Sequence, residues 1–140
     1  MAKKWGYVLL GAGRPDRDLQ RRVMALVGVD MGEFGTYWED TLPPRATRPR
    51  SALVQRKHLL QEVGSDDVVT VASLLCLGAS PADAEWFIRQ VWERGGRMVI
   101  HDRAGDLGTD LTELLADFER QRAALHLRRS RAKMRKSPGT

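Results

Sequence analysis

Four short segments of the chain are rich in apolar, aromatic or β-branched residues. Runs of this kind, bounded by glycine or polar residues, are typical of strands. The run that begins at Tyr7 ends at a glycine-rich turn, and the run that begins at Asp67 is dense in valine, which favours a central place in a sheet. The predicted strands are residues 7–10, 34–40, 67–73 and 98–102.

Between these strands, apolar residues return every three or four positions, which is the spacing of one helix face. Ser80 and Pro81 suit the N-cap and first position of one such helix, and Gly95 with Gly96 suits its end. Strands that alternate with helices indicate an α/β layered fold with a mostly parallel sheet of four or more strands, spanning residues 1–106. The predicted helices are residues 16–29, 50–62 and 81–94.

From about residue 109 the chain predicts one long uninterrupted helix. Leucine and phenylalanine recur there at three-, four- and seven-residue intervals, and no proline or glycine follows until Pro138. About 28 residues at about 1.5 Å each would make a helix of about 40 Å, longer than a domain of this size needs. We therefore expect a long helix over 107–136, with an apolar first half that docks on its own domain or on a second subunit. Residues 137–140 are expected to be a disordered end.

Charge is distributed unevenly along the 140 residues, which are 42% hydrophobic and carry a net charge of +5. Residues 120–140 hold eight basic residues and no acid, whereas the rest of the chain holds 15 basic residues and all 18 acids. A mildly acidic body with a strongly basic tail indicates a polyanionic partner, with nucleic acid as the first candidate. The alternative is a solvated tail that only aids solubility.

The remaining chemistry-bearing residues predict no cofactor and no metal. The three histidines, His58, His101 and His126, lie on separate predicted elements without metal-ligand spacing. The single cysteine, Cys76, suits a reducing cytosol, and its apolar neighbours favour a buried structural thiol. No stretch approaches the roughly 18 apolar residues of a membrane helix. We expect a cytoplasmic, nucleoid-associated protein with no membrane contact.

Gly11 and Gly13, which follow the first strand, raise the alternative of a dinucleotide site. That site needs a third glycine at position 16, where this chain has Asp16, a carboxylate that would meet the pyrophosphate. Glu33 lies near the distance expected for the ribose-binding acid, and no phosphate-binding G-K-[ST] loop occurs. The pattern therefore disfavours an enzyme that binds a nucleotide.

Taken in order, these segments resemble the catalytic domain of the serine recombinases, the resolvase and invertase family. The resemblance covers essentially the whole chain and implies a resolvase-like fold, in which a long helix pairs two subunits and then follows the DNA backbone. The family's first strand, Y-x-R-V-S-T, corresponds to residues 7–12 of this chain, and the glutamine that follows it corresponds to Gln20. The pair Arg48-Pro49 and residues 65–80 match the next two motifs, the second of which ends in L-G-R-S in the family. Phe118-Glu119-Arg120 matches the family's long helix.

The resemblance also implies that this chain has lost recombinase chemistry. The family's nucleophilic serine falls on Gly11, which has no side chain to form a link to DNA. Losing one charged transition-state donor typically costs a factor of about 100 or more, and several are replaced here. Since the replacements run from charged to apolar, Leu9, Gly11, Cys76 and Ala79 are also candidates for a reused apolar interface. The vacated positions are Leu9, Gly11, Leu75, Cys76 and Ala79.

Carried onto the long helix, the resemblance implies two surfaces. The expected oligomer interface of a homo-oligomer comprises Leu111, Leu114, Leu115, Phe118 and Leu125. The expected DNA-binding residues, which would contact mainly phosphates, are Arg122, Arg128, Arg129, Arg131, Lys133, Arg135 and Lys136.

The sequence thus predicts a catalytically inactive DNA-binding protein with a regulatory or architectural role. A second DNA-binding protein or a recombinase is a further expected partner. The alternative is a protein-interaction module that docks a recombinase or another partner without binding DNA itself.

Overall fold

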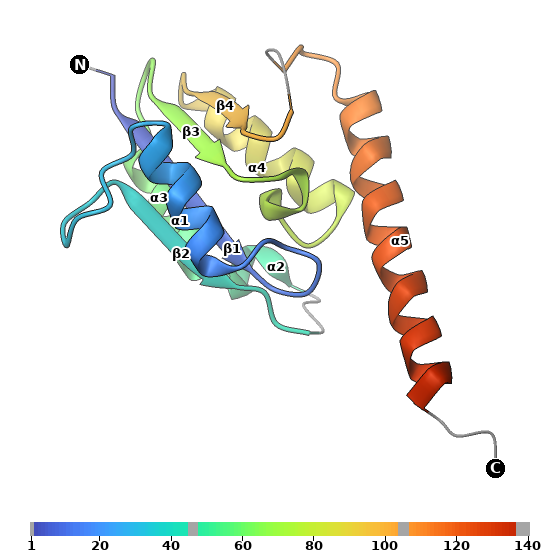
Figure 1. The fold of residues 1–140 in the computed structure, drawn as a ribbon. Coiled ribbons are helices and arrows are strands. Elements are labelled where there is room, and N and C mark those ends of the chain that lie inside the picture. The colour runs from blue at the N-terminus through green and yellow to red at the C-terminus, as the bar shows by residue number, and fades with distance from the viewer. Residues whose placement is uncertain (1, 45–47, 104–106, 137–140) are drawn as a thin grey trace.

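The computed structural model describes residues 2–44, 48–103 and 107–136. Four strands form one all-parallel sheet in the order β2-β1-β3-β4, which confirms the predicted α/β fold (Figure 1). Each strand lies within or next to a segment that the apolar pattern singled out. The strands are β1 (Lys4–Leu10), β2 (Tyr37–Thr41), β3 (Val68–Val71) and β4 (Arg97–Ile100).

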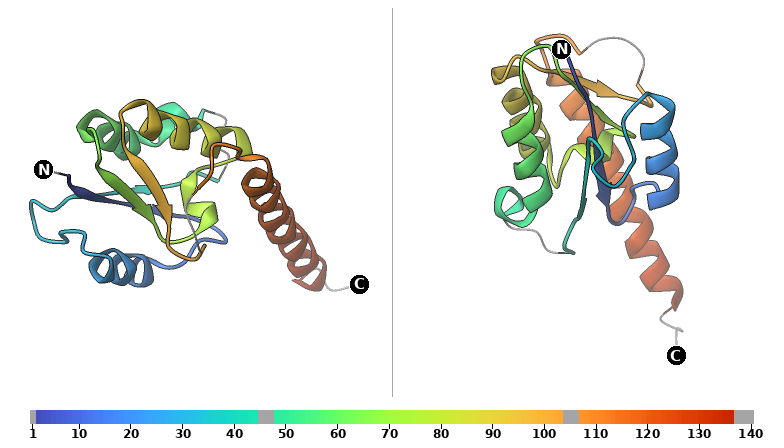
Figure 2. Two further views of the ribbon diagram at one scale, coloured as in Figure 1. Left: turned by 90° about the horizontal axis from the view of Figure 1, so that it is seen from above. Right: turned by 90° about the vertical axis from the view of Figure 1, so that its left-hand side faces the viewer.

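Helices cover both faces of this sheet, as parallel strands require. α1 (Arg17–Leu26) packs on one face, and α3 (Val54–Glu62) and α4 (Pro81–Glu93) pack on the other (Figure 2). Ser80 caps α4 as predicted, because its hydroxyl accepts a hydrogen bond of 3.1 Å from the Asp83 N–H. The sheet is therefore doubly wound, and its strand order reverses direction between β1 and β3.

The predicted helix over 50–62 is two helices in the structure, α2 (Pro49–Ala52) and α3. The cause is Asp40, at the end of β2, whose carboxylate accepts hydrogen bonds from the N–H groups of Gln55 at 3.0 Å and Arg56 at 2.8 Å. This carboxylate caps α3 from a neighbouring strand and fixes where that helix begins. A short 3₁₀ helix, η1 (Leu74–Leu77), follows β3.

The long helix, α5 (Thr112–Lys136), is part of the domain over its first half. Leu111, Leu114 and Phe118 are at most 4% exposed and join the main core with α4 and η1. Leu115 packs against the same cluster, and Leu125 lies against Gly13 of the loop between β1 and α1. Leu111, Leu114 and Phe118, three of the five residues predicted at an oligomer interface, therefore pack inside their own domain, whereas Leu115 and Leu125 are partly exposed.

The carboxyl half of α5 extends past the end of the sheet, as predicted for a projecting helix (Figure 1). Among the described residues, no helix is both long enough and apolar enough to cross a membrane. The predicted disordered end, residues 137–140, lies outside the described residues.

Candidate functional site

Doubly wound sheets bind ligands in the crevice at the carboxyl ends of the strands where the strand order reverses. In this chain the crevice is occupied by Gln20, a fully buried residue of α1. Pairing between β1 and β3 ends at Tyr7 and Val71. Beyond that point the Gln20 amide pairs with Leu9: Oε1 accepts from its N–H at 3.1 Å, and Nε2 donates to its carbonyl at 2.8 Å. Gln20 thus continues the sheet into the space where a ligand would lie.

Cys76 of η1 fills the rest of this crevice. Its Sγ lies 3.5 Å from Gln20 Oε1 and 3.3 Å from the Ser73 hydroxyl, and the residue is fully buried. Burial raises the pKa of the Cys76 thiol, which keeps it protonated at neutral pH. A buried, protonated thiol is a poor nucleophile, so the structure supports the structural role predicted for this cysteine.

Arg14 holds the glycine-rich loop after β1 in place. Its guanidinium donates hydrogen bonds to the carbonyl oxygens of Ala12 at 2.9 Å, Leu75 at 2.9 Å and Gly78 at 2.7 Å. The loop is thereby fastened across the end of the sheet to η1. Sequence reasoning missed this role, because an arginine beside two glycines carries no sign of the distant carbonyls that it contacts.

Three of the positions that the resemblance marks as vacated lie in the core of the domain. Leu9 and Cys76 are fully buried, Leu75 is 5% exposed, and all three belong to the main apolar cluster. The suggestion of a reused apolar interface is therefore wrong for Leu9 and Cys76, because their side chains pack inside the domain. Gly11 has a φ of +154°, a backbone conformation in which a side chain is disfavoured.

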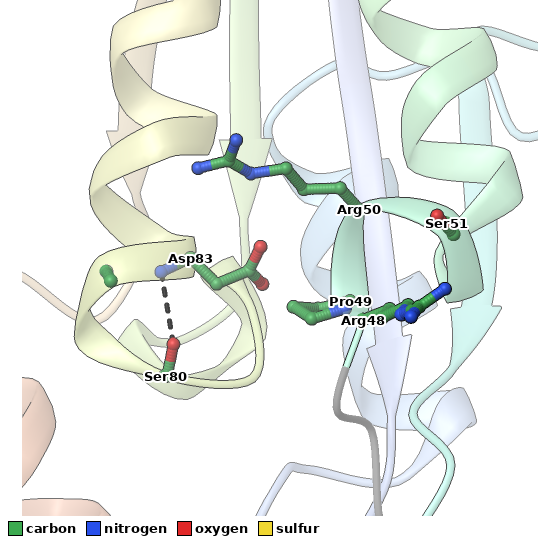
Figure 3. A pocket seen from close by; sticks show the side chains of 7 residues that line it. Arg48, Pro49, Arg50, Ser51, Ser80 and Asp83 are labelled. Carbon is green, nitrogen blue, oxygen red and sulfur yellow. Dashed lines mark hydrogen bonds between the residues drawn. The ribbon is translucent and has the colours of Figure 1, made fainter.

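Arg48, the arginine retained at a family position, lies beside a cavity of about 400 Å³ between α2 and the first turn of α4 (Figure 3). Two other polar groups of this cavity have structural partners: the Ser80 hydroxyl caps α4, and the Asp83 carboxylate pairs with Arg56. Asp83 and Ser80 are therefore committed to structure, and no histidine, cysteine or further carboxylate stands among the described residues that line the cavity to activate the Ser51 hydroxyl.

The ion pair between Arg56 and Asp83 joins the two helices that cover the main core. Two hydrogen bonds, of 2.9 and 2.7 Å, connect the guanidinium to the carboxylate, and both side chains are at most 2% exposed. The Ala79 N–H also donates to this carboxylate at 2.9 Å. Gly78 makes room for the pair, since a Cβ there would collide with Asp83 Oδ2. The pair is a buried structural link rather than a reactive one.

The predicted DNA-binding residues fall into three groups in the structure. Arg122 is partly buried at the domain, where it donates to the Ala79 carbonyl at 3.3 Å and pairs with Glu119. Arg128 and Arg131 are exposed on the projecting half of α5, and within the described chain no carboxylate pairs with them. The side chains outside the described residues are Arg129, Lys133, Arg135 and Lys136.

No protein-family model matches this chain, and no curated protein matches it either. The proposed kinship with the serine recombinases therefore rests on the sequence motifs alone.

Proposed function

We propose that this protein binds duplex DNA through the basic carboxyl half of α5 and that its α/β domain carries no recombinase activity. One observation carries the proposal. Residues 120–140 hold eight basic residues and no acid, and the helix that bears most of them leaves the domain. A row of cations that projects from a mildly acidic body suits a backbone of phosphates.

The geometry of α5 sets the size of this contact. From Arg128 to Lys136 the helix advances about 12 Å, and a duplex carries one phosphate charge for every 1.7 Å or so of its axis. Arg128, Arg131 and Arg135 follow one another at helical spacing on one face of α5. That length of duplex carries about seven phosphate charges, and since α5 faces it with one side only, we expect about five of them to be neutralised by each chain.

Little direct reading of base sequence is expected from this helix. Residues 127–140 contain no asparagine, glutamine or aromatic side chain, the types that contact base edges or stack on bases. Phosphate contacts position a protein without specifying sequence. An architectural or regulatory role, with any sequence choice made through groove shape or a partner, follows from this composition.

The inactive domain is the second part of the proposal. It is supported by the glycine at the nucleophile position and by the crevice that Gln20 and Cys76 fill. The domain would then serve to hold and orient α5.

A charge reversal on α5 tests the DNA-binding proposal. In Arg128→Glu/Arg131→Glu, two phosphate contacts are lost and two repulsions are added, so we expect affinity for a labelled duplex to fall at least about tenfold at low salt. Fluorescence anisotropy measures this change. The matched control is Arg22→Glu, an exposed arginine on α1, which should change affinity less than about threefold. Equal losses in the two variants would contradict a site on α5.

A further inference from the structure

A second basic surface lies far from the projecting half of α5 along the chain. A groove of about 530 Å³ runs between α3 and α4, on the sheet face opposite α1. Arg50, Lys57 and Arg94 border it, one from each of α2, α3 and the end of α4. Within the part of the chain that the structure describes, none of the three takes part in an ion pair.

Two of these cations are held in position at the groove. The Arg50 guanidinium lies over the Trp86 ring, 4.8 Å from its centre. Arg94 donates hydrogen bonds to the carbonyl and the side-chain oxygen of Gln90, at 3.0 and 2.8 Å. None of these contacts neutralises a positive charge. The groove therefore carries uncompensated charge on side chains whose positions are already fixed.

Apolar atoms line the groove between these cations. Val54 is 47% exposed, and the partly buried Trp86 and the buried Leu60 continue the same lining. An apolar lining with a basic border is complementary to an amphipathic segment that has leucine-like side chains on one face and carboxylates on the other.

We propose that this groove binds an acidic amphipathic helix of a partner protein. The partner's apolar side chains cover Val54 and Trp86, and its carboxylates pair with Arg50, Lys57 and Arg94. Nucleic acid fits less well, because phosphates gain nothing from an apolar lining in a concave groove. This partner site is independent of the DNA contact on α5, and each can fail without the other.

A synthetic peptide tests the proposal on the full chain. The probe is a labelled peptide of about four helical turns, with leucine at i, i+3, i+4 and i+7 and glutamate elsewhere. We expect Lys57→Glu to weaken its binding about tenfold, because an attraction becomes a repulsion in a partly enclosed site. Val54→Asp should weaken binding by a similar factor. Both side chains are exposed, so both variants should fold.

Three comparisons complete the experiment. Arg22→Glu, the same charge change on the opposite face of the sheet, should leave peptide binding within about twofold. Replacing every glutamate of the peptide by glutamine should abolish most of the binding. Duplex DNA should bind Lys57→Glu as it binds the unaltered chain. The proposal is overturned if the acidic peptide does not bind, if the neutral peptide binds equally well, or if Lys57→Glu loses DNA rather than peptide.

Discussion

Asp83→Asn is expected to lower the free energy of unfolding by about 3–5 kcal/mol, because it leaves the Arg56 guanidinium charged and uncompensated in the core. Asparagine keeps the size of the side chain, so the loss reports the missing charge rather than a cavity. Urea unfolding followed by tryptophan fluorescence measures the change, since Trp86 lies beside Arg56, whose guanidinium is 5.1 Å from the centre of its ring.

The control for this change is Glu85→Gln on the same helix. Glu85 pairs with Arg89 at the surface, and an exposed pair four residues apart contributes only about 0.3–0.5 kcal/mol. Replacing both buried partners by apolar residues, Arg56→Met with Asp83→Leu, should recover most of the stability, because it removes the unpaired charge. If Asp83→Asn were as mild as Glu85→Gln, the buried pair would not link α3 to α4 as described.

Phe118→Ala should lower the free energy of unfolding by a similar amount, about 3–5 kcal/mol. Phe118 is completely buried within its own chain, at 0% exposure, and anchors α5 on the core. The unfolding midpoint of the variant should not depend on protein concentration. A midpoint that rises with concentration in the unaltered protein and not in Phe118→Ala would place this side chain between copies instead.

Leu127→Ala provides the comparison on the same helix. Leu127 is 53% exposed and lies where α5 has left the domain, so its removal should change stability by no more than about 0.5 kcal/mol. A large loss at Leu127 together with a small loss at Phe118 would contradict the way in which α5 docks.

The elements of the fold could be predicted because their signals are local. Valine-rich runs, the helical return of apolar residues, and the Ser80-Pro81 pair each act within a few positions of the chain. The break before α3 could not be predicted in this way. It depends on Asp40, which reaches the N–H groups of Gln55 and Arg56 from a strand 15 residues earlier.

The sequence predicts that the candidate site lacks a nucleophile, but it does not predict which side chains fill the site. The glycine that stands where the recombinase resemblance places a nucleophile is visible in the sequence, whereas the contacts of Gln20 and Arg14 depend on the packing of distant segments. The burial of three predicted interface residues inside the domain has the same origin. An apolar stripe such as Leu111, Leu114 and Phe118 suits its own core as well as a second copy, because hydrophobic burial has no direction.

The most direct test of the central proposal is duplex DNA binding across a salt series, for the full chain and for a chain that ends at Leu127. Neutralising about five phosphates predicts that log affinity falls with log salt at a slope near −4 to −5, and that the shorter chain loses this steep dependence together with most of its affinity. Equal slopes for the two chains, or no binding by the full chain even at low salt, would contradict a DNA-binding role for α5.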